Sequence, residues 1–149
     1  MSFSLHFKEE IPAPRQLVWD VICDTESYAL WNPFIVACES SFEPGTPITM
    51  RVKMPPLPVF TQKESIFSNV SGELMEYGIN QPFGLLSSVR QHVLTELSAD
   101  SCRYESFFEL RGKLAPMVGF ALGKKLERGF AGMTQGIARR SIELHNSNK

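Results

Sequence analysis

The long stretch from Leu114 to about Leu144 constrains the fold more than any other part of the chain. Pro116 lies where the first turn of a helix tolerates a missing N–H, and no proline follows it. Apolar residues then recur at helical spacings, namely Phe120, Leu126, Phe130, Met133, Ile137 and Leu144. The pattern predicts one amphipathic α-helix on the order of 40 Å long, enough to cross a small domain.

Five glycines interrupt this predicted helix: Gly119, Gly123, Gly129, Gly132 and Gly136. Each lowers helix stability by about 0.5–1 kcal/mol relative to alanine, so another effect must offset that loss. Close approach of the helix to a sheet is the simpler explanation. The alternative is that the missing side chains leave space for a ligand between helix and sheet. Charges scattered through the segment argue against a membrane helix.

The composition is that of an ordinary globular protein. At 149 residues, with 43% hydrophobic and 21% charged residues, the chain fits one domain spanning 1–149. Its net charge of −1 offers no basic surplus for a phosphate backbone, so we expect no nucleic-acid partner. No apolar run reaches the length of a membrane span, so we expect no stable membrane insertion.

The cysteines and the amino terminus bear on the compartment. Cys23, Cys38 and Cys102 are odd in number and have no paired spacing, which indicates buried thiols rather than disulfides. Residues 1–10 lack the apolar core of a signal peptide. We therefore expect a protein of the reducing cytoplasm.

The rest of the chain is predicted to be one strand, two short helices and a series of strands. Residues 2–11 alternate between apolar and polar side chains, as in a half-buried strand. Helical segments are expected at 15–24 and 26–30. Further strands are expected at 34–40, 47–54, 61–69, 73–79, 85–97 and 102–111. Consecutive strands with the helices kept apart predict an α+β domain, one sheet face of which the long helix covers.

Alternation also predicts which side chains face that helix. In 102–111 the inward set is Tyr104, Ser106, Phe108 and Leu110. In 85–97 the inward set is Val89, Val93 and Leu97 together with Ser87, Gln91 and Thr95, which places His92 on the opposite face. Glu105 and Glu109 alternate with the inward set, which favours a solvated face shared with Arg111 over a pair of catalytic carboxylates.

Several sequence segments resemble the START-like helix-grip superfamily, which includes polyketide cyclase/dehydrase and lipid-transport (SRPBCC-type) domains. They are Ile11-Pro12-Ala13-Pro14, Val18-Trp19-Asp20, Trp31-Asn32-Pro33-Phe34-Ile35 and the segment from Phe108 to Pro116. The resemblance covers essentially the whole chain. It implies a curved antiparallel sheet of about seven strands wrapped around the carboxy-terminal helix, with two short helices after the first strand.

In this family an apolar cavity between sheet and helix binds lipids, sterols, polyketides, quinones or plant hormones. The resemblance brings no universal catalytic residue, so we assign none. We expect the cavity to be lined by Trp31, Phe34, Met50, Val52, Met54, Phe83, Leu85, Val89, Gln91, Ser106, Phe108, Leu110, Phe120, Phe130 and Met133. Gln91, Ser87 and Ser106 are the candidates for orienting a ligand's carbonyl or hydroxyl, unless they make only structural hydrogen bonds.

The function that follows is binding or carriage of a small hydrophobic molecule, with no cofactor and no metal. The alternatives are a cyclase or dehydratase acting in the same cavity and a module that binds chaperones. The enzyme alternative requires a titratable group inside the cavity, and the sequence offers no compelling one. The ligand's identity and the oligomeric state stay open.

Overall fold

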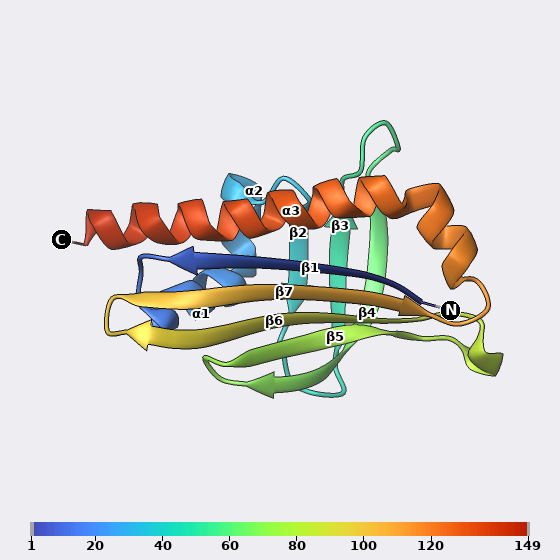
Figure 1. Cartoon of the computed structure of the whole chain (residues 1–149), viewed down its shortest axis with the longest axis horizontal. Coiled ribbons are helices and arrows are strands. Elements are labelled where there is room, and N and C mark those ends of the chain that lie inside the picture. The colour runs from blue at the N-terminus through green and yellow to red at the C-terminus, as the bar shows by residue number, and fades with distance from the viewer. Residues whose placement is uncertain (1, 149) are drawn as a thin grey trace.

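The computed structural model describes residues 2–148, which form one sheet and a long helix with two short helices (Figure 1). The strands are β1 (Ser2–Ile11), β2 (Ile35–Ser40), β3 (Pro47–Val52), β4 (Phe60–Val70), β5 (Leu74–Asn80), β6 (Ser87–Ser98) and β7 (Ser101–Arg111). The α-helices are α1 (Arg15–Cys23), α2 (Tyr28–Trp31) and α3 (Ala115–Ser147). All seven strands are antiparallel, in the order β1-β7-β6-β5-β4-β3-β2.

The predicted fold class is confirmed. The sheet curls around α3, which runs the length of the molecule, and α1 and α2 follow β1 as expected (Figure 1). Several boundaries differ by one or two residues from those predicted; in β6 the reason is that residues 82–84 form a 3₁₀ turn, which delays the start of the strand to Ser87. In that turn Phe83 has a φ of 63°, a backbone conformation that side chains with a Cβ rarely adopt.

The glycines of α3 allow close packing. A Cβ on Gly129 would lie 2.4 Å from the Phe34 ring, and one on Gly136 would lie 2.8 Å from the carbonyl oxygen of Trp31. Gly119 and Gly123 lie against the Phe3 ring of β1. None of these glycines lines the cavity that lies between the sheet and α3. The contacts therefore support close packing of the helix as the explanation for these glycines, rather than space left for a ligand.

The interior is filled under the carboxy-terminal half of α3. There α1 packs between α3 and the far ends of β6 and β7. The side chains that meet in this region are almost completely buried: Ile11, Val18, Ile22, Leu94, Cys102 and Ile137. Apolar burial of this kind is the main source of stability in a domain of this size.

The prediction of the inward face of β6 is wrong. Ser88, Arg90, His92 and Leu94 face α3, each with 4% or less of its surface exposed. Their neighbours Val89, Gln91 and Val93 face outward. The register fixes this phase, because Arg90 lies opposite Phe108, which faces inward in β7 as predicted. Polar side chains therefore occupy the inner face of a central strand.

The sheet is also open along part of one seam. Strands β4 and β5 pair from Val70 opposite Leu74 as far as Ser65 opposite Gly78, and no pair continues beyond that point. Residues 60–64 of β4 and 79–80 of β5 thus lie at a gap in the ladder. The cavity between the sheet and α3 reaches this gap, where Gln62, Glu64 and Ile79 form part of its wall.

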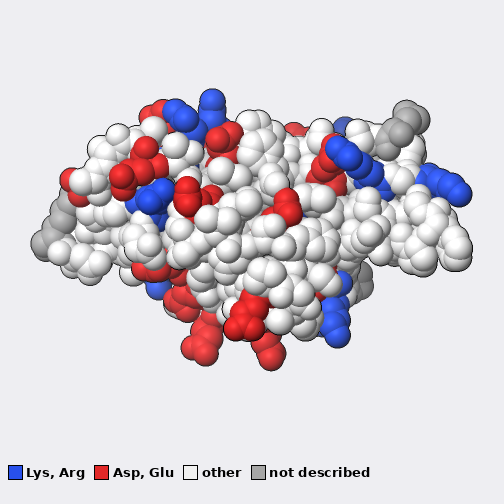
Figure 2. All heavy atoms as spheres, turned by 90° about the horizontal axis from the view of Figure 1, so that it is seen from below, with Lys and Arg blue, Asp and Glu red and all other residues white. Residues whose placement is uncertain are grey.

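Charged residues do not gather into a basic surface on the face shown in Figure 2, where acidic and basic side chains are both scattered. Among residues 2–148, no helix is long and apolar enough to span a membrane.

Candidate functional site

A cavity of about 310 Å³ lies between the inner face of the sheet and the amino-terminal half of α3. On the helix side its wall is Val118, Leu122, Leu126, Phe130 and Met133. These positions share one face of the helix, spaced by three or four residues. Their side chains leave this end of the interior unfilled, in contrast to the other end.

The structure brings eight of the residues predicted to line the cavity together around it: Phe34, Met50, Val52, Met54, Phe108, Leu110, Phe130 and Met133. Three of the rings form a cluster. Phe130 stacks on Phe108 with ring centroids 4.6 Å apart, and it meets the edge of Phe34 at 4.9 Å. Most of the cavity wall is therefore apolar, as ligand-binding cavities usually are.

Two other predicted residues are buried but do not line the cavity. Trp31 packs against Tyr28 and Gly136 in the filled part of the interior, since α2 ends there beside α3. Ser106 is 1% exposed, and its hydroxyl accepts a hydrogen bond from the Arg90 guanidinium. Ser106 thus acts on the cavity through Arg90 rather than by direct contact.

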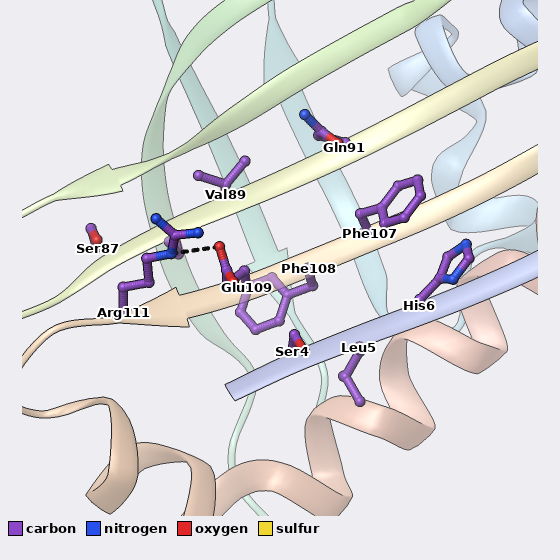
Figure 3. Close-up of a pocket in the computed structure, with 11 residues that line it drawn as sticks. Ser4, Leu5, His6, Ser87, Val89, Gln91, Phe107, Phe108, Glu109 and Arg111 are labelled. Atoms are coloured by element: carbon purple, nitrogen blue, oxygen red, sulfur yellow. Dashed lines mark ion pairs between the residues drawn. The ribbon is translucent and has the colours of Figure 1, made fainter. Parts of the chain in front are cut away.

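Val89, Gln91 and Ser87 lie on the outer face of the sheet, so the prediction that they face the cavity is wrong. They border a separate pocket over β1, β7 and β6, on the face of the sheet away from α3, while Leu5 points toward that helix (Figure 3). The Gln91 amide donates to a Glu76 carboxylate oxygen at 2.6 Å. The error follows directly from the inverted phase of β6.

The same outer face holds the two glutamates of β7. Glu109 pairs with Arg111 at 2.7 Å, and Glu105 with His6 at 2.9 Å (Figure 3 shows the first pair). The His6 ring also stacks on Phe107 with centroids 4.2 Å apart. Each carboxylate therefore has its own surface partner, and the two do not form an acid–base pair.

Phe83, Leu85 and Phe120 are exposed, so their predicted place in the cavity is also wrong. Phe120 is 95% exposed and Phe83 86% exposed. The helix turns Phe120 away from the cavity because Val118 and Leu122, on either side of it, face inward. Phe83 and Leu85 belong to the turn before β6 and not to the strand itself.

Arg90 is the most unusual residue of the cavity wall. It is 3% exposed, and none of the ion pairs among residues 2–148 involves it. Its guanidinium donates to the Ser106 hydroxyl, to the Gln91 carbonyl oxygen at 3.4 Å and to the Met133 sulfur at 3.5 Å. It also lies 4.6 Å from the centroid of the Phe130 ring. A buried cation with only neutral partners is costly to the fold.

A chain of hydrogen bonds holds the surroundings of Arg90 in place. The two ring nitrogens of His92 meet the Tyr104 hydroxyl at 2.6 Å and the Tyr77 hydroxyl at 3.0 Å. Burial, followed by the charge of Arg90, lowers the pKa of His92 well below its usual value, so the ring is neutral. Burial raises the pKa of both tyrosines, which keeps their hydroxyls protonated. Tyr77 itself lines the cavity.

Glu64 supplies a carboxyl group to the same cavity. It lies on β4 beside the open seam, and its carboxylate accepts a hydrogen bond from the Gln62 amide at 3.2 Å. Burial raises the pKa of Glu64, and the Gln62 hydrogen bond and the charge of Arg90 offset this only in part. The cavity therefore combines apolar walls with one guanidinium and one carboxyl group.

The sequence prediction missed Arg90, Glu64, Gln62 and Tyr77. For β4 a signal existed, since Gln62 and Glu64 alternate in phase with the buried Ile66. For β6 both phases mix polar and apolar residues, so alternation alone did not distinguish them. The pairing of β6 with its neighbours β5 and β7 places Arg90 inside, opposite the buried Tyr77 and Phe108.

The family model described as polyketide cyclase / dehydrase and lipid transport matches residues 2–142. None of the curated protein sequences compared with the chain matches it significantly.

Three solved structures illustrate the likeness of the fold. The Zhui aromatase/cyclase from Streptomyces sp. R1128 has a TM-score of 0.75 and 14% identity, covering 95% of this chain and 94% of its own. A START superfamily protein from Mycobacterium smegmatis has a TM-score of 0.71 and 17% identity, covering 95% and 98%. Norcoclaurine synthase from Thalictrum flavum, in complex with dopamine and hydroxybenzaldehyde, has a TM-score of 0.71 and 16% identity, covering 96% and 88%.

At these identities the structural likeness concerns the fold alone, and it agrees with the curled sheet and long helix described above. The family model spans nearly the whole chain, including both walls of the cavity. The chain belongs to the polyketide cyclase/dehydrase and lipid-transport family.

Proposed function

We propose that this protein binds or carries a small, largely apolar molecule that has an oxygen-containing polar group. The observation that supports this most directly is the buried Arg90, which makes no ion pair among residues 2–148 and lies in the wall of a largely apolar cavity. A ligand carbonyl, phenolate or carboxylate beside Arg90 would compensate the buried charge. The free thiols of Cys23, Cys38 and Cys102 fit a carrier that works in the cytoplasm.

The energetics of such binding rest mainly on the aromatic and aliphatic walls. Burial of apolar surface contributes about 25 cal/mol per Å², so a ligand with one or two rings gains several kcal/mol before the entropy of association is subtracted. A hydrogen bond to a charged group adds about 1.5–3 kcal/mol. The walls would thus set the affinity, and Arg90 would set the orientation.

A matched pair of small ligands tests this proposal. Naphthalene and 2-naphthol have the same apolar body, but only 2-naphthol offers a hydroxyl oxygen to Arg90. Displacement of the neutral fluorophore N-phenyl-1-naphthylamine reports the binding of each. We expect 2-naphthol to bind about tenfold more tightly, a ratio that corresponds to one charge-assisted hydrogen bond.

Two variants complete the test. Arg90→Met should remove the preference for 2-naphthol and leave naphthalene affinity nearly unchanged. Arg111→Met, on the outer face of the sheet, should behave like the parent protein. Absence of saturable binding of the fluorophore and of both ligands would contradict the proposal. Native mass spectrometry of the protein purified from its own host would identify the natural ligand.

A second candidate function, acid–base catalysis in the same cavity, is favoured by Glu64. Its pKa is raised by burial, which brings a general base closer to neutral pH, and Arg90 lines the same cavity. With a ketone bound, the Glu64 carboxylate would take a proton from the carbon next to the carbonyl. The electrons of that C–H bond would move to the carbonyl oxygen, where Arg90 would stabilise the enolate.

Deuterium exchange distinguishes the carrier from the enzyme. 2-Tetralone in deuterated water exchanges the protons next to its carbonyl, and proton NMR follows the rate. A catalyst should speed this exchange well above the spontaneous rate, and Glu64→Gln should abolish the acceleration while the ketone still binds. Exchange at the spontaneous rate with the ketone bound would leave the carrier function alone.

A further inference from the structure

A second hollow, of about 220 Å³, lies beside the cavity on the outside of the molecule. It is formed where the loop after β3 meets α3, and we refer to it as the basic groove. The residues that matter here are Phe34, Lys53, Met54, Lys125, Arg128 and Gly129. Three of these six are cationic, and no acidic residue lines the groove.

The three cations come together because of how α3 meets the segment before β2. Lys125 and Arg128 are three residues apart, so they project from neighbouring positions on the helix. Gly129 lets this part of α3 approach the Phe34 ring, since a Cβ there would lie 2.4 Å from it. Lys53 is held nearby because its backbone N–H donates to the Phe34 carbonyl oxygen at 2.8 Å. The fold therefore builds the groove around Phe34.

The positive charge of the groove is not neutralised within the part of the chain that the structure describes. Neither the ion pairs nor the side-chain hydrogen bonds among residues 2–148 include the charged groups of Lys53, Lys125 or Arg128. Glu127 directly precedes Arg128 in the sequence, but it is about 100° around the helix axis from Arg128 and about 160° from Lys125. Like charges at this helical spacing slightly destabilise a helix, so the arrangement has a small energetic cost.

The basic groove and the apolar cavity share two wall residues, Phe34 and Met54. A molecule whose apolar part fills the cavity could therefore reach the groove by passing one or both of these side chains. Methionine is pliable, and the Phe34 side chain borders both hollows. The two hollows together suit an elongated ligand with one apolar end and one anionic end.

We propose that the basic groove binds a phosphate group carried by the ligand, so that the natural ligand is an apolar molecule with a phosphate at its outer end. This inference rests on the proposed binding function and specifies its ligand class. Three cations suit a phosphate monoester, which carries close to two negative charges at neutral pH and offers several acceptor oxygens. An arginine among them can bind phosphate through two parallel N–H donors.

Decanol and decyl phosphate, each used below its micelle-forming concentration, test the proposal by displacement of N-phenyl-1-naphthylamine. The two ligands share the apolar chain and differ in the phosphate. We expect the parent protein to bind decyl phosphate at least tenfold more tightly than decanol. The preference should shrink as salt is raised, because exposed charges are screened.

A triple variant and a charge-matched control locate the phosphate. Lys53→Gln/Lys125→Gln/Arg128→Gln should lose the preference and keep the parent's affinity for decanol. Lys8→Gln/Lys113→Gln/Lys124→Gln removes the same net charge outside the groove and should keep the preference. Inorganic phosphate alone, at millimolar concentration, should weaken decyl phosphate binding without displacing decanol if the groove also accepts the free anion. No such competition is expected if it requires the attached chain.

The outcomes separate this inference from the proposed function. Binding of both ligands with equal affinity by the parent protein would overturn the phosphate inference alone. So would a preference that survives in the groove variant, one that is lost equally in the control, or one that Arg90→Met removes while the groove variant keeps it. Failure of both ligands to displace the fluorophore would instead overturn the proposed binding function.

Discussion

The two ends of α3 cover very different interiors. Under its carboxy-terminal half, Ile137 is completely buried among Ile11, Val18 and Ile22, and Gly136 touches the backbone at Trp31. Under its amino-terminal half, Leu122 and Leu126 remain partly exposed and face a cavity. One helix thus closes the interior at one end and leaves it open at the other.

The difference in packing under the two halves of α3 distinguishes the residues that stabilise the fold from those that bind a ligand. Close packing at the closed end gains the burial energy that holds the helix on the sheet. At the open end the same helix gives up part of that energy, and Arg90 is buried there without an ion pair among the described residues. Structures that retain such a cost commonly do so at functional sites. We therefore expect substitutions at the closed end to change folding, and those at the open end to change ligand binding.

The largest expected effect is that of Ile137→Ala at the closed end. Removing a fully buried isoleucine side chain from a close-packed site should lower the free energy of unfolding by about 2–5 kcal/mol. Leu122→Ala, on the same helix but over the cavity, is the matched control and should lose less than about 1 kcal/mol. Urea unfolding followed by circular dichroism measures both. Equal losses at the two positions would show that the ends do not differ in packing.

The sequence was sufficient to predict the long helix, the order of the elements and the α+β class. Proline-free helical spacing after Pro116 and alternation in residues 2–11 are strong local signals, and both elements appear where they were expected. The eight apolar residues that surround the cavity were predicted for the same reason. Six of them lie on a strand or helix whose apolar face is the inner one, while Phe34 directly precedes β2 and Met54 closely follows β3.

The remainder of the cavity could not be predicted because its inner face is partly polar. Alternation identifies the buried face of a strand only when burial follows hydrophobicity. In β6 three of the four buried residues are polar, namely Ser88, Arg90 and His92, while valines at 89 and 93 face outward. Long-range pairing with β7 decides this phase, and a local pattern does not contain that information. The polar residues on the inner face of β6, which a binding function would need, are therefore the reason that alternation assigned the wrong face of this strand to the interior.

Gly136→Ala should have the second largest effect. A Cβ at this position would lie 2.8 Å from the Trp31 carbonyl oxygen, and a backbone atom cannot move away easily. We expect a loss of about 1–3 kcal/mol, despite the better helix propensity of alanine. Gly132→Ala is the control, since its Cβ would meet only Pro33 Cγ at 3.1 Å, and it should be neutral or slightly stabilising. Thermal unfolding of both variants measures the contrast. A stable Gly136→Ala protein would mean that α3 can shift at its closed end.

Arg90→Met tests the open end, where we expect little loss of stability. The variant removes a buried charge and keeps a long side chain against Phe130, although Ser106 loses its donor. The free energy of unfolding should stay equal to the parent's or rise by up to about 1 kcal/mol. Chemical denaturation without ligand measures it. A loss above about 2 kcal/mol would assign Arg90 a structural role and weaken the argument that its buried charge serves binding.

The smallest effect concerns the pH dependence that Glu64 adds at the open end. Burial raises its pKa above the value of 4.5 that holds for an unperturbed carboxyl, so the folded protein binds more protons than the unfolded chain just above pH 4.5. Stability should therefore fall as pH rises through the raised pKa and then stay constant, because the penalty for burying the charged form is then complete. Glu64→Gln lacks this dependence.

The comparison of parent and Glu64→Gln isolates that contribution, because every other titrating group is common to both. We expect the stability of the variant relative to the parent to increase between pH 4 and neutral pH, as measured by urea midpoints at each pH. Glu73→Gln, at an exposed position outside the cavity, is the control. A difference that grows toward acid would mean that the fold favours the charged form of Glu64. The partly closed cavity would then already solvate its carboxylate, and Glu64 would be better suited to hold a cationic or hydrogen-bonding ligand group than to take a proton.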